Sequence, residues 1–328
     1  MAARSGPKPQ QLDDQGIYRL YFDAGNPRCW NFYGHTNTNW GNGVNLYSSW
    51  FINHDKMIDG SHDNPDITTG DDAQLTVPNS FRKDYGGVLQ FNGSDDNLLV
   101  DLNNSLRLDK DTEINGTDIN TDKFSFEIWF RCTLTAGVAP AAVRPATIMD
   151  FGGPNSSSST TFLRQGILGI RGDGKLGWMN YLYTGSFDYN DDGYDSVPIV
   201  ISDKAGTSGM PTFGVGDTGW QYVAIYDTWA TGGSNLTYSV SVNGVLSGQV
   251  SGRTAGGGKS DNVFTVQNTA YLGVARDRTS TDTSARLNYM NGQIAIIKAA
   301  VYPSSGSVGF TSETAAHNYD AMKGRFGL

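Results

Sequence analysis

The sequence predicts an all-β protein built as an antiparallel β-sandwich, and three observations lead to this prediction. Aromatic residues make up 12% of the 328 residues, and aromatic and β-branched side chains suit pleated, half-buried strands. The 41 glycines and many Asn, Asp, Ser and Thr residues stand between short apolar runs, as expected for strands joined by tight turns. Only three of the 33 acidic residues are Glu, whereas a helical chain of this size would be rich in Glu, Leu and Lys.

Candidate strands follow one another in regular order along the chain. Residues 1–16 are polar and lack periodicity, which predicts a flexible N-terminal arm, and residues 29–82 are irregular, which predicts a long loop. Short apolar runs predict strands at 17–22, 88–91, 97–101, 124–130, 146–151, 166–170, 177–181, 220–226, 236–242, 270–274 and 292–297.

The clearest strand and turn signals lie in the middle of the chain. In the run 124–130, strict alternation places three Phe and one Ile on one face and Glu127 and Trp129 on the other. The turn Gly172-Asp173-Gly174 joins two runs in a predicted hairpin. Asn243-Gly244 is the strongest hairpin signal, because this pair favours the primed turns that match strand twist.

One short helix is predicted near the C-terminus, at about residues 312–323. Thr311 or Ser312 supplies the capping hydroxyl at its start, and Gly324 ends it. Residues 17–328 are predicted to form a single domain, since β-sandwiches of this order of length commonly have one core.

The composition excludes several classes of function. A net charge of −9 and a pI of about 4.8 argue against nucleic acid and anionic membrane partners, which need a basic surface. No apolar run approaches the ~20 residues of a membrane span. The N-terminal residues lack the apolar core of a signal peptide, so export by the general secretory route is not expected. Cys29 and Cys132 are therefore expected to be reduced.

Six short motifs occur in an order that resembles a known family. They are Leu89-Gln90-Phe91-Asn92-Gly93 with Asp96, Phe124-Ser125-Phe126-Glu127-Ile128-Trp129-Phe130, Trp220-Gln221-Tyr222-Val223-Ala224, Val242-Asn243-Gly244, Tyr271-Leu272-Gly273, and Gly292-Gln293-Ile294-Ala295-Ile296. Together, over about residues 85–303, they resemble the concanavalin A-like and laminin-G-like domains. The resemblance implies a jelly-roll sandwich with long N-terminal loops and one short C-terminal helix.

Two further segments resemble a narrower group within this family, found in tailed-phage virion proteins. These are residues 20–27, at the first strand, and residues 311–328, at the C-terminal helix. The resemblance implies a non-enzymatic virion structural protein, such as a head decoration, fibre or tail component, assembled in the host cytoplasm. The implied partners are other virion proteins, further copies of the chain, and a cell-surface glycan.

Catalytic signals are weak. Retaining glucanases of this fold carry paired acids on one strand, because retention needs two carboxyl groups about 5 Å apart. Glu127 has no acid two residues away on either side, so that arrangement is absent. A glycoside hydrolase that uses two Asp from distant loops remains the less favoured alternative, and the prediction is that the chain is not an enzyme.

An acidic loop matches the opening of a calcium-binding loop. The proposed ligands are Asp188, Asn190, Asp192, the carbonyl group of Tyr194, and Asp195. The twelfth position is Ile199 rather than Glu, and no helices flank the loop, so a solvated acidic turn is the competing interpretation. If Ca²⁺ does bind, the chain is alternatively a calcium-dependent carbohydrate-binding module.

Several aromatic residues have two interpretations. Most aromatic side chains in sheets belong to a core, but those on an exposed face stack on sugar rings. The candidates for such a sugar platform are Trp129, Trp178, Tyr181, Tyr183 and Trp229.

Overall fold

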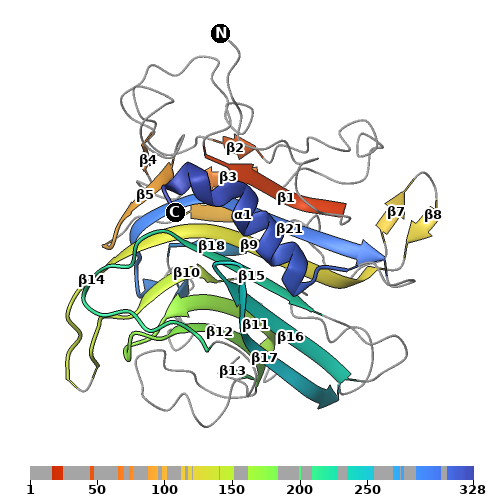
Figure 1. Ribbon diagram of the computed structural model, residues 1–328. Coiled ribbons are helices and arrows are strands. Elements are labelled where there is room, and N and C mark those ends of the chain that lie inside the picture. The colour runs from red at the N-terminus through yellow and green to blue at the C-terminus, as the bar shows by residue number, and fades with distance from the viewer. Residues whose placement is uncertain are drawn as a thin grey trace.

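The fold is given for the part of the chain that the computed structural model describes (Figure 1). The described residues are 17–24, 45–47, 66–69, 74–76, 88–94, 98–101, 112–114, 117–119, 121–139, 141–150, 162–183, 199–200, 209–227, 235–254, 269–273, 275–276, 286–303 and 309–328. The predicted arm at residues 1–16 lies outside them, and the single domain over 17–328 stays a prediction.

Two antiparallel sheets form the two layers of a sandwich. The main path of the larger sheet, sheet A, runs β17 (Val245–Thr254), β16 (Asn235–Val242), β15 (Gln221–Asp227), β9 (Thr121–Leu134), β21 (Asn291–Pro303), β5 (Val88–Asn92) and β4 (Gln74–Thr76). Two further strands pair beside this path: β1 (Ile17–Asp23) with β21, and β14 (Gly216–Asp217) with β9.

Sheet B is the second layer. Its strands run in the order β13 (Ile199–Val200), β12 (Leu176–Tyr183), β11 (Phe162–Ile170), β10 (Ala146–Asp150), β18 (Thr269–Leu272), β6 (Leu98–Asp101), β3 (Asp66–Thr69) and β2 (Asn45–Tyr47). Two small two-stranded sheets pair β7 (Thr112–Ile114) with β8 (Thr117–Ile119), and β19 (Ala275–Arg276) with β20 (Arg286–Leu287). The predicted antiparallel β-sandwich with one C-terminal helix is therefore confirmed.

The expectation that residues 29–82 form one irregular loop is wrong. Three short strands, β2, β3 and β4, lie within this segment, and they extend both sheets. They are three or four residues long. Strands this short hold too few residues for an alternating pattern to stand out from the surrounding polar sequence.

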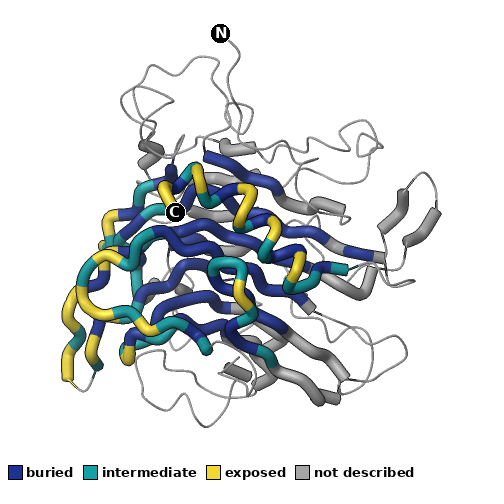
Figure 2. Tube along the Cα trace, viewed as in Figure 1, coloured by how far each residue is buried: buried dark blue, intermediate teal, exposed yellow. Residues whose placement is uncertain are grey.

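The centre of sheet A is buried on both faces. Phe126, Ile128 and Phe130 of β9 join the main core between the sheets. Trp129, on the opposite face of the same strand, belongs to a second apolar cluster with residues of the C-terminal helix. Figure 2 shows buried residues running through the strands of both layers. The predicted alternation along β9 is thus observed, but both of its faces are covered.

The C-terminal helix α1 (Ser312–Lys323) lies across the outer face of sheet A and leads into the 3₁₀ turn η5 (Gly324–Phe326) (Figure 1). The hydroxyl oxygen of Thr311 accepts a hydrogen bond from the backbone N–H of Thr314 at 3.2 Å, which is a standard N-cap. Gly324 is the C-cap, as predicted. No helix in the described part of the chain is long and apolar enough to cross a membrane.

The predicted turn at Asn243-Gly244 joins β16 to β17 and also supports the helix. Both residues have positive φ, 50° and 77°, as a primed hairpin turn requires. The Asn243 side chain accepts from the Tyr222 N–H and donates to Gln221, both at 2.9 Å. A Cβ on Gly244 would lie 3.1 Å from the Cα atom of Ala316 in α1, so this turn packs tightly beneath the helix.

Candidate functional site

Two of the five aromatic residues proposed for a sugar platform are buried. Trp129 is 1% exposed and Trp178 is fully buried. Phe326 and Tyr319 stack on the Trp129 ring, with centroids 4.2 and 5.7 Å away, because the C-terminal helix covers this face. Trp178 packs in the core between the sheets. The platform interpretation is wrong for these two residues, since neither presents a ring face to solvent.

The remaining candidates lie where the structure gives no side chains. Tyr181 and Tyr183 fall within β12, but their side chains are not described. Trp229 and the acidic loop with Asp188, Asn190, Asp192, Tyr194 and Asp195 lie outside the described residues. Calcium binding at this loop therefore stays a prediction. Among the described residues, no group of three or more His, Cys, Asp or Glu is placed to hold a metal ion.

A buried ion pair lies under the C-terminal helix. Glu127 of β9 and Lys298 of β21 are directly opposite each other in the sheet, and their side chains are 1% and 2% exposed. The Lys298 ammonium donates to the two Glu127 carboxylate oxygens at 3.3 and 3.4 Å. The Tyr222 hydroxyl donates to the same carboxylate at 2.6 Å, and the Asn318 amide of α1 donates to it at 3.1 Å.

This ion pair couples the helix to the sheet. Removing two charges from water costs several kcal/mol per ion unless further hydrogen bonds complete their surroundings. Tyr222 supplies one such bond from sheet A, whereas Asn318 supplies the other from α1. The helix therefore contributes both an apolar cover and a polar partner for Glu127.

A second ion pair connects the two ends of the described chain. Arg325, in η5, donates to both carboxylate oxygens of Asp23 at 2.8 and 2.9 Å. Asp23 is the last residue of β1, and the two side chains are 7% and 13% exposed. We call this pair the terminal clasp. It ties the first strand to the last turn across 302 residues of sequence.

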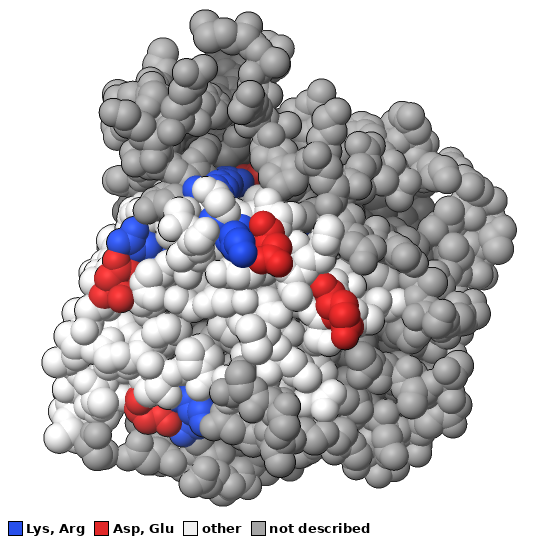
Figure 3. Space-filling model, viewed as in Figure 1, with Lys and Arg blue, Asp and Glu red and all other residues white. Residues whose placement is uncertain are grey.

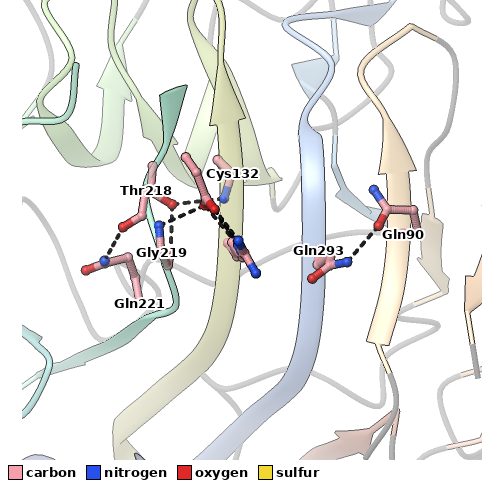
Figure 4. A network of polar contacts seen from close by, with 8 residues as sticks. Gln90, Cys132, Thr218, Gly219, Gln221 and Gln293 are labelled. Atoms are coloured by element: carbon pink, nitrogen blue, oxygen red, sulfur yellow. Dashed lines mark hydrogen bonds and ion pairs between the residues drawn. The ribbon is translucent and has the colours of Figure 1, made fainter. Parts of the chain in front are cut away.

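A row of polar side chains crosses the part of sheet A near the start of β21. Gln293 of β21 is opposite Arg131 of β9 on one side and Gln90 of β5 on the other. Its amide donates to Gln90 at 2.9 Å, as seen in Figure 4. Arg131 forms a bidentate ion pair with Asp217 of β14, with its Nε atom 2.8 Å from one oxygen and 3.0 Å from the other. We call Asp217, Arg131, Gln293 and Gln90 the polar row.

The turn after β14 holds the polar row in place. The Thr218 N–H donates to the Cys132 carbonyl oxygen, and the Thr218 hydroxyl oxygen accepts from the Cys132 N–H, both at 2.9 Å (Figure 4). Thr218 thus pairs with β9 as a strand residue would. The Gly219 N–H donates to Asp217 at 2.9 Å. Burial raises the pKa of the Cys132 thiol, so this side chain remains a neutral core group.

The electrostatics of the polar row favour binding over proton transfer. The hydrogen bond from Arg131 holds the pKa of Asp217 below its ordinary value of 3.8, and the backbone bond from Gly219 acts in the same direction. Asp217 is therefore ionised at neutral pH and is a poor general acid. The ion pair is about one third exposed, and with the two amides the row carries no net charge. Such planar donors and acceptors suit neutral hydroxyl groups.

Sequence comparisons do not place the chain in a family. No model of a known protein family matches it, and no curated protein matches it in sequence. Three solved structures illustrate the structural likeness. Tailspike protein 2 from the Escherichia coli O157:H7 bacteriophage CAB120 is 14% identical, with a TM-score of 0.39 over 82% of this chain and 29% of the tailspike. The chain thus spans under a third of that protein.

The other two structures are carbohydrate-binding proteins. The carbohydrate recognition domain of Emp46p is 13% identical, with a TM-score of 0.37 over 71% of this chain and 87% of that domain. Winged bean acidic lectin, solved with methyl-α-D-galactose, is 12% identical, with a TM-score of 0.32 over 74% of this chain and 95% of the lectin. These TM-scores are too low to support an inference about function. The strands themselves define the chain as an all-β sandwich protein.

We expect Glu127→Gln to destabilise the protein by about 3–5 kcal/mol, because Lys298 is then buried without a countercharge. Thermal and urea unfolding followed by circular dichroism measure the change. Glu313→Gln is the matched control on the exposed first turn of α1, and we expect its effect to stay within about 0.5 kcal/mol. A Glu127→Gln variant as stable as the control would show that the ion pair is not needed.

The Asp217 pKa predicts a dependence of stability on pH. A carboxyl group whose pKa is lower in the folded state stabilises the fold above its unfolded-state pKa, and this contribution is lost as the pH falls through the folded-state value. As the pH is lowered from about 5 to about 3, the Tm of Asp217→Asn should therefore fall less than the Tm of the wild type. Asp173→Asn, at another exposed turn, controls for the loss of one negative charge. If the Tm of Asp217→Asn and of the wild type fell equally with acid, the lowered pKa of Asp217 in the folded protein would be contradicted.

Proposed function

We propose that the protein is a non-enzymatic virion structural protein whose β-sandwich mediates assembly and contacts neutral glycans. The terminal clasp is the observation that carries the assembly role. The two segments that resemble tailed-phage virion proteins, residues 20–27 and 311–328, are far apart in sequence but meet through Asp23 and Arg325. The two segments that carry the resemblance are therefore in contact in the folded chain.

This unit closes the outer face of sheet A. β1 pairs with β21 from Ile17 to Asp23, and the helix that follows Thr311 packs on the same sheet. Phe326 of the final turn stacks on Trp129 and also contacts Trp220. A protein built into a particle must keep its fold among crowded neighbours, and tying the first strand to the last turn opposes fraying from either side.

Three carboxylate side chains among the described residues are candidates for catalysis, and their burial, ion pairing or lowered pKa supports a non-enzymatic role. Glu127 is buried under α1 and paired with Lys298, so substrate has no access to it. Asp23 is nearly buried and paired with Arg325. Asp217 is accessible, but the Arg131 hydrogen bond lowers its pKa. A glycoside hydrolase needs an acid that is protonated near neutral pH beside a second free carboxylate.

The polar row supports the glycan-binding part of the proposal. Neighbouring strands lie about 4.8 Å apart, which is close to the length of one sugar ring, so side chains on adjacent strands can meet successive sugar units. Among the described residues, charged side chains are sparse on the face seen in Figure 3. The chain as a whole carries a net charge of −9, which disfavours acidic polysaccharides. Neutral sugars are the ligand class that fits both observations.

The assembly role predicts that purified particles contain the chain in many copies. Quantitative mass spectrometry of density-purified virions, with peptides of this chain counted against a known capsid protein, measures the copy number. Arg325→Ala should lower the copy number because the terminal clasp is lost, whereas Lys323→Ala, at the end of the preceding helix α1 and with a side chain that is 42% exposed, should not. Intact virions that lack the chain would end this proposal.

The glycan role predicts binding to neutral glycans on an array, with weaker or absent binding to sialylated and uronic-acid glycans. Gln293→Ala should reduce the binding at least tenfold, because it removes the centre of the polar row. Gln249→Ala is the matched control, since Gln249 is also a half-buried Gln of sheet A, and its side chain donates to Ser239. Equal binding by the two variants, or no neutral ligand for the wild type, would contradict this role.

A further inference from the structure

Three side chains beneath α1 bring an amine, an amide and a carboxylate together, and we call them the buried triad. Lys298 of β21 and Asn318 of α1 both donate to one oxygen of Glu127, Oε2, at 3.3 and 3.1 Å. The carbon atom of Asn318 that an amine can attack, Cγ, is bonded to the nitrogen that makes the second of these bonds. A nucleophile, an electrophile and a group that transfers protons therefore meet at a single oxygen atom.

The buried triad is closed off from water. The Glu127 and Lys298 side chains are 1% and 2% exposed, and Asn318 is fully buried. Two aromatic residues of the second apolar cluster lie against the triad. The Tyr222 hydroxyl donates to Glu127, and the Lys298 ammonium lies 6.0 Å from the centre of the Tyr21 ring. Because burial disfavours charged groups, a buried ion pair can convert to a neutral amine and a neutral acid by moving one proton.

Asn318 is an unusual residue for its position. It lies in the buried stripe of α1 between Ala315 and Met322, where apolar side chains pack on the sheet. Asn is a weak helix former, and the hydrogen bond to Glu127 uses only the nitrogen end of its amide. The other end, Oδ1, is buried and accepts no hydrogen bond from the described residues, which costs free energy. Stability alone does not account for this amide, whereas a reaction at its carbon atom does.

We propose that Lys298 and Asn318 form an isopeptide bond, with Glu127 as the catalytic residue. In the neutral form of the ion pair, the Nζ atom attacks Cγ of Asn318 and a new C–N bond forms. Glu127 accepts a proton from Nζ and gives one to Nδ2. The Cγ–Nδ2 bond then breaks and ammonia leaves. The products are one amide, one ammonia molecule and the acid form of Glu127, so atoms and charges balance without an oxidant or a cofactor.

The packing of the helix on the sheet favours this reaction. The flexible stem of Lys298 lets Nζ move from Oε2 to the adjacent Cγ atom, while the strand and the helix keep both reactants in place. The new bond joins β21 to α1 and fixes the helix on the outer face of sheet A (Figure 1). It forms once in each molecule and takes no outside substrate. The inference therefore goes beyond the proposed function and does not depend on it.

Mass spectrometry of the full chain, purified and then denatured, tests this bond. The wild type should be lighter than its sequence by one ammonia molecule, and a proteolytic digest should contain a branched peptide that joins Lys298 to Asn318. Acetylation of the denatured chain should modify one amine fewer than the sequence contains. Glu127→Gln should keep the full mass and a free Lys298 amine. Glu313→Gln, on the exposed first turn of α1, is the matched control and should lose ammonia as the wild type does.

A second variant, Asn318→Asp, separates this reaction from other losses of ammonia. A carboxyl group at this position gives the same amide by losing water, so the crosslinked variant should have the mass of the crosslinked wild type. Ammonia is also lost when an Asn-Gly pair such as Asn243-Gly244 cyclises to a succinimide. A succinimide hydrolyses at mildly alkaline pH, whereas the isopeptide bond persists.

The wild type alone decides whether the bond exists. A wild type of full mass, with Lys298 acetylated, would overturn the proposal. The same holds for an ammonia loss that the digest places at an Asn-Gly pair, or one that Asn318→Asp retains. A Glu127→Gln variant that is folded by circular dichroism and still carries the branched peptide would overturn the role of Glu127. If that variant does not fold, the branched peptide of the wild type and the mass of Asn318→Asp decide the outcome.

Discussion

The buried ion pair between Glu127 and Lys298 is the constraint on which the architecture of sheet A depends. The two charges stand on neighbouring strands at the centre of a face that in many sandwiches is open to solvent. Because both are buried, the face needs a cover that also supplies a hydrogen bond, and α1 provides it through Asn318. An apolar cover alone would leave the carboxylate less well solvated than it is.

The cover divides the outer face of sheet A into two regions. Beneath α1 and η5, Trp129 and its aromatic neighbours form a closed second core. Near the start of β21, the same face carries the polar row, in which Arg131 pairs with Asp217, Gln293 donates to Gln90, and the side chains remain partly exposed. A ligand on this sheet therefore meets hydroxyl-binding groups and no aromatic ring of the described part of β9.

The polar row ends at an edge of sheet A, where β14 pairs with the end of β9. Asp217 of β14 is the acid of the row. The pairing of β14 with β9 holds this acid in register with the rest of the row. The glycan contacts proposed above would thus lie beside this edge of sheet A.

Local features of the sequence determined the strands, the turns and the ends of the helix. Alternation along β9, the positive-φ turn at Asn243-Gly244 and the cap at Thr311 each depend on a few consecutive residues. Only the tertiary structure decided the partners of Glu127, which lie 95 to 191 residues away, and hence the burial of Trp129. The alternation along a strand indicates which side chains share a face. The element that covers this face comes from a distant part of the sequence. Burial and charge pairing depend on that element, so the strand alone does not predict them.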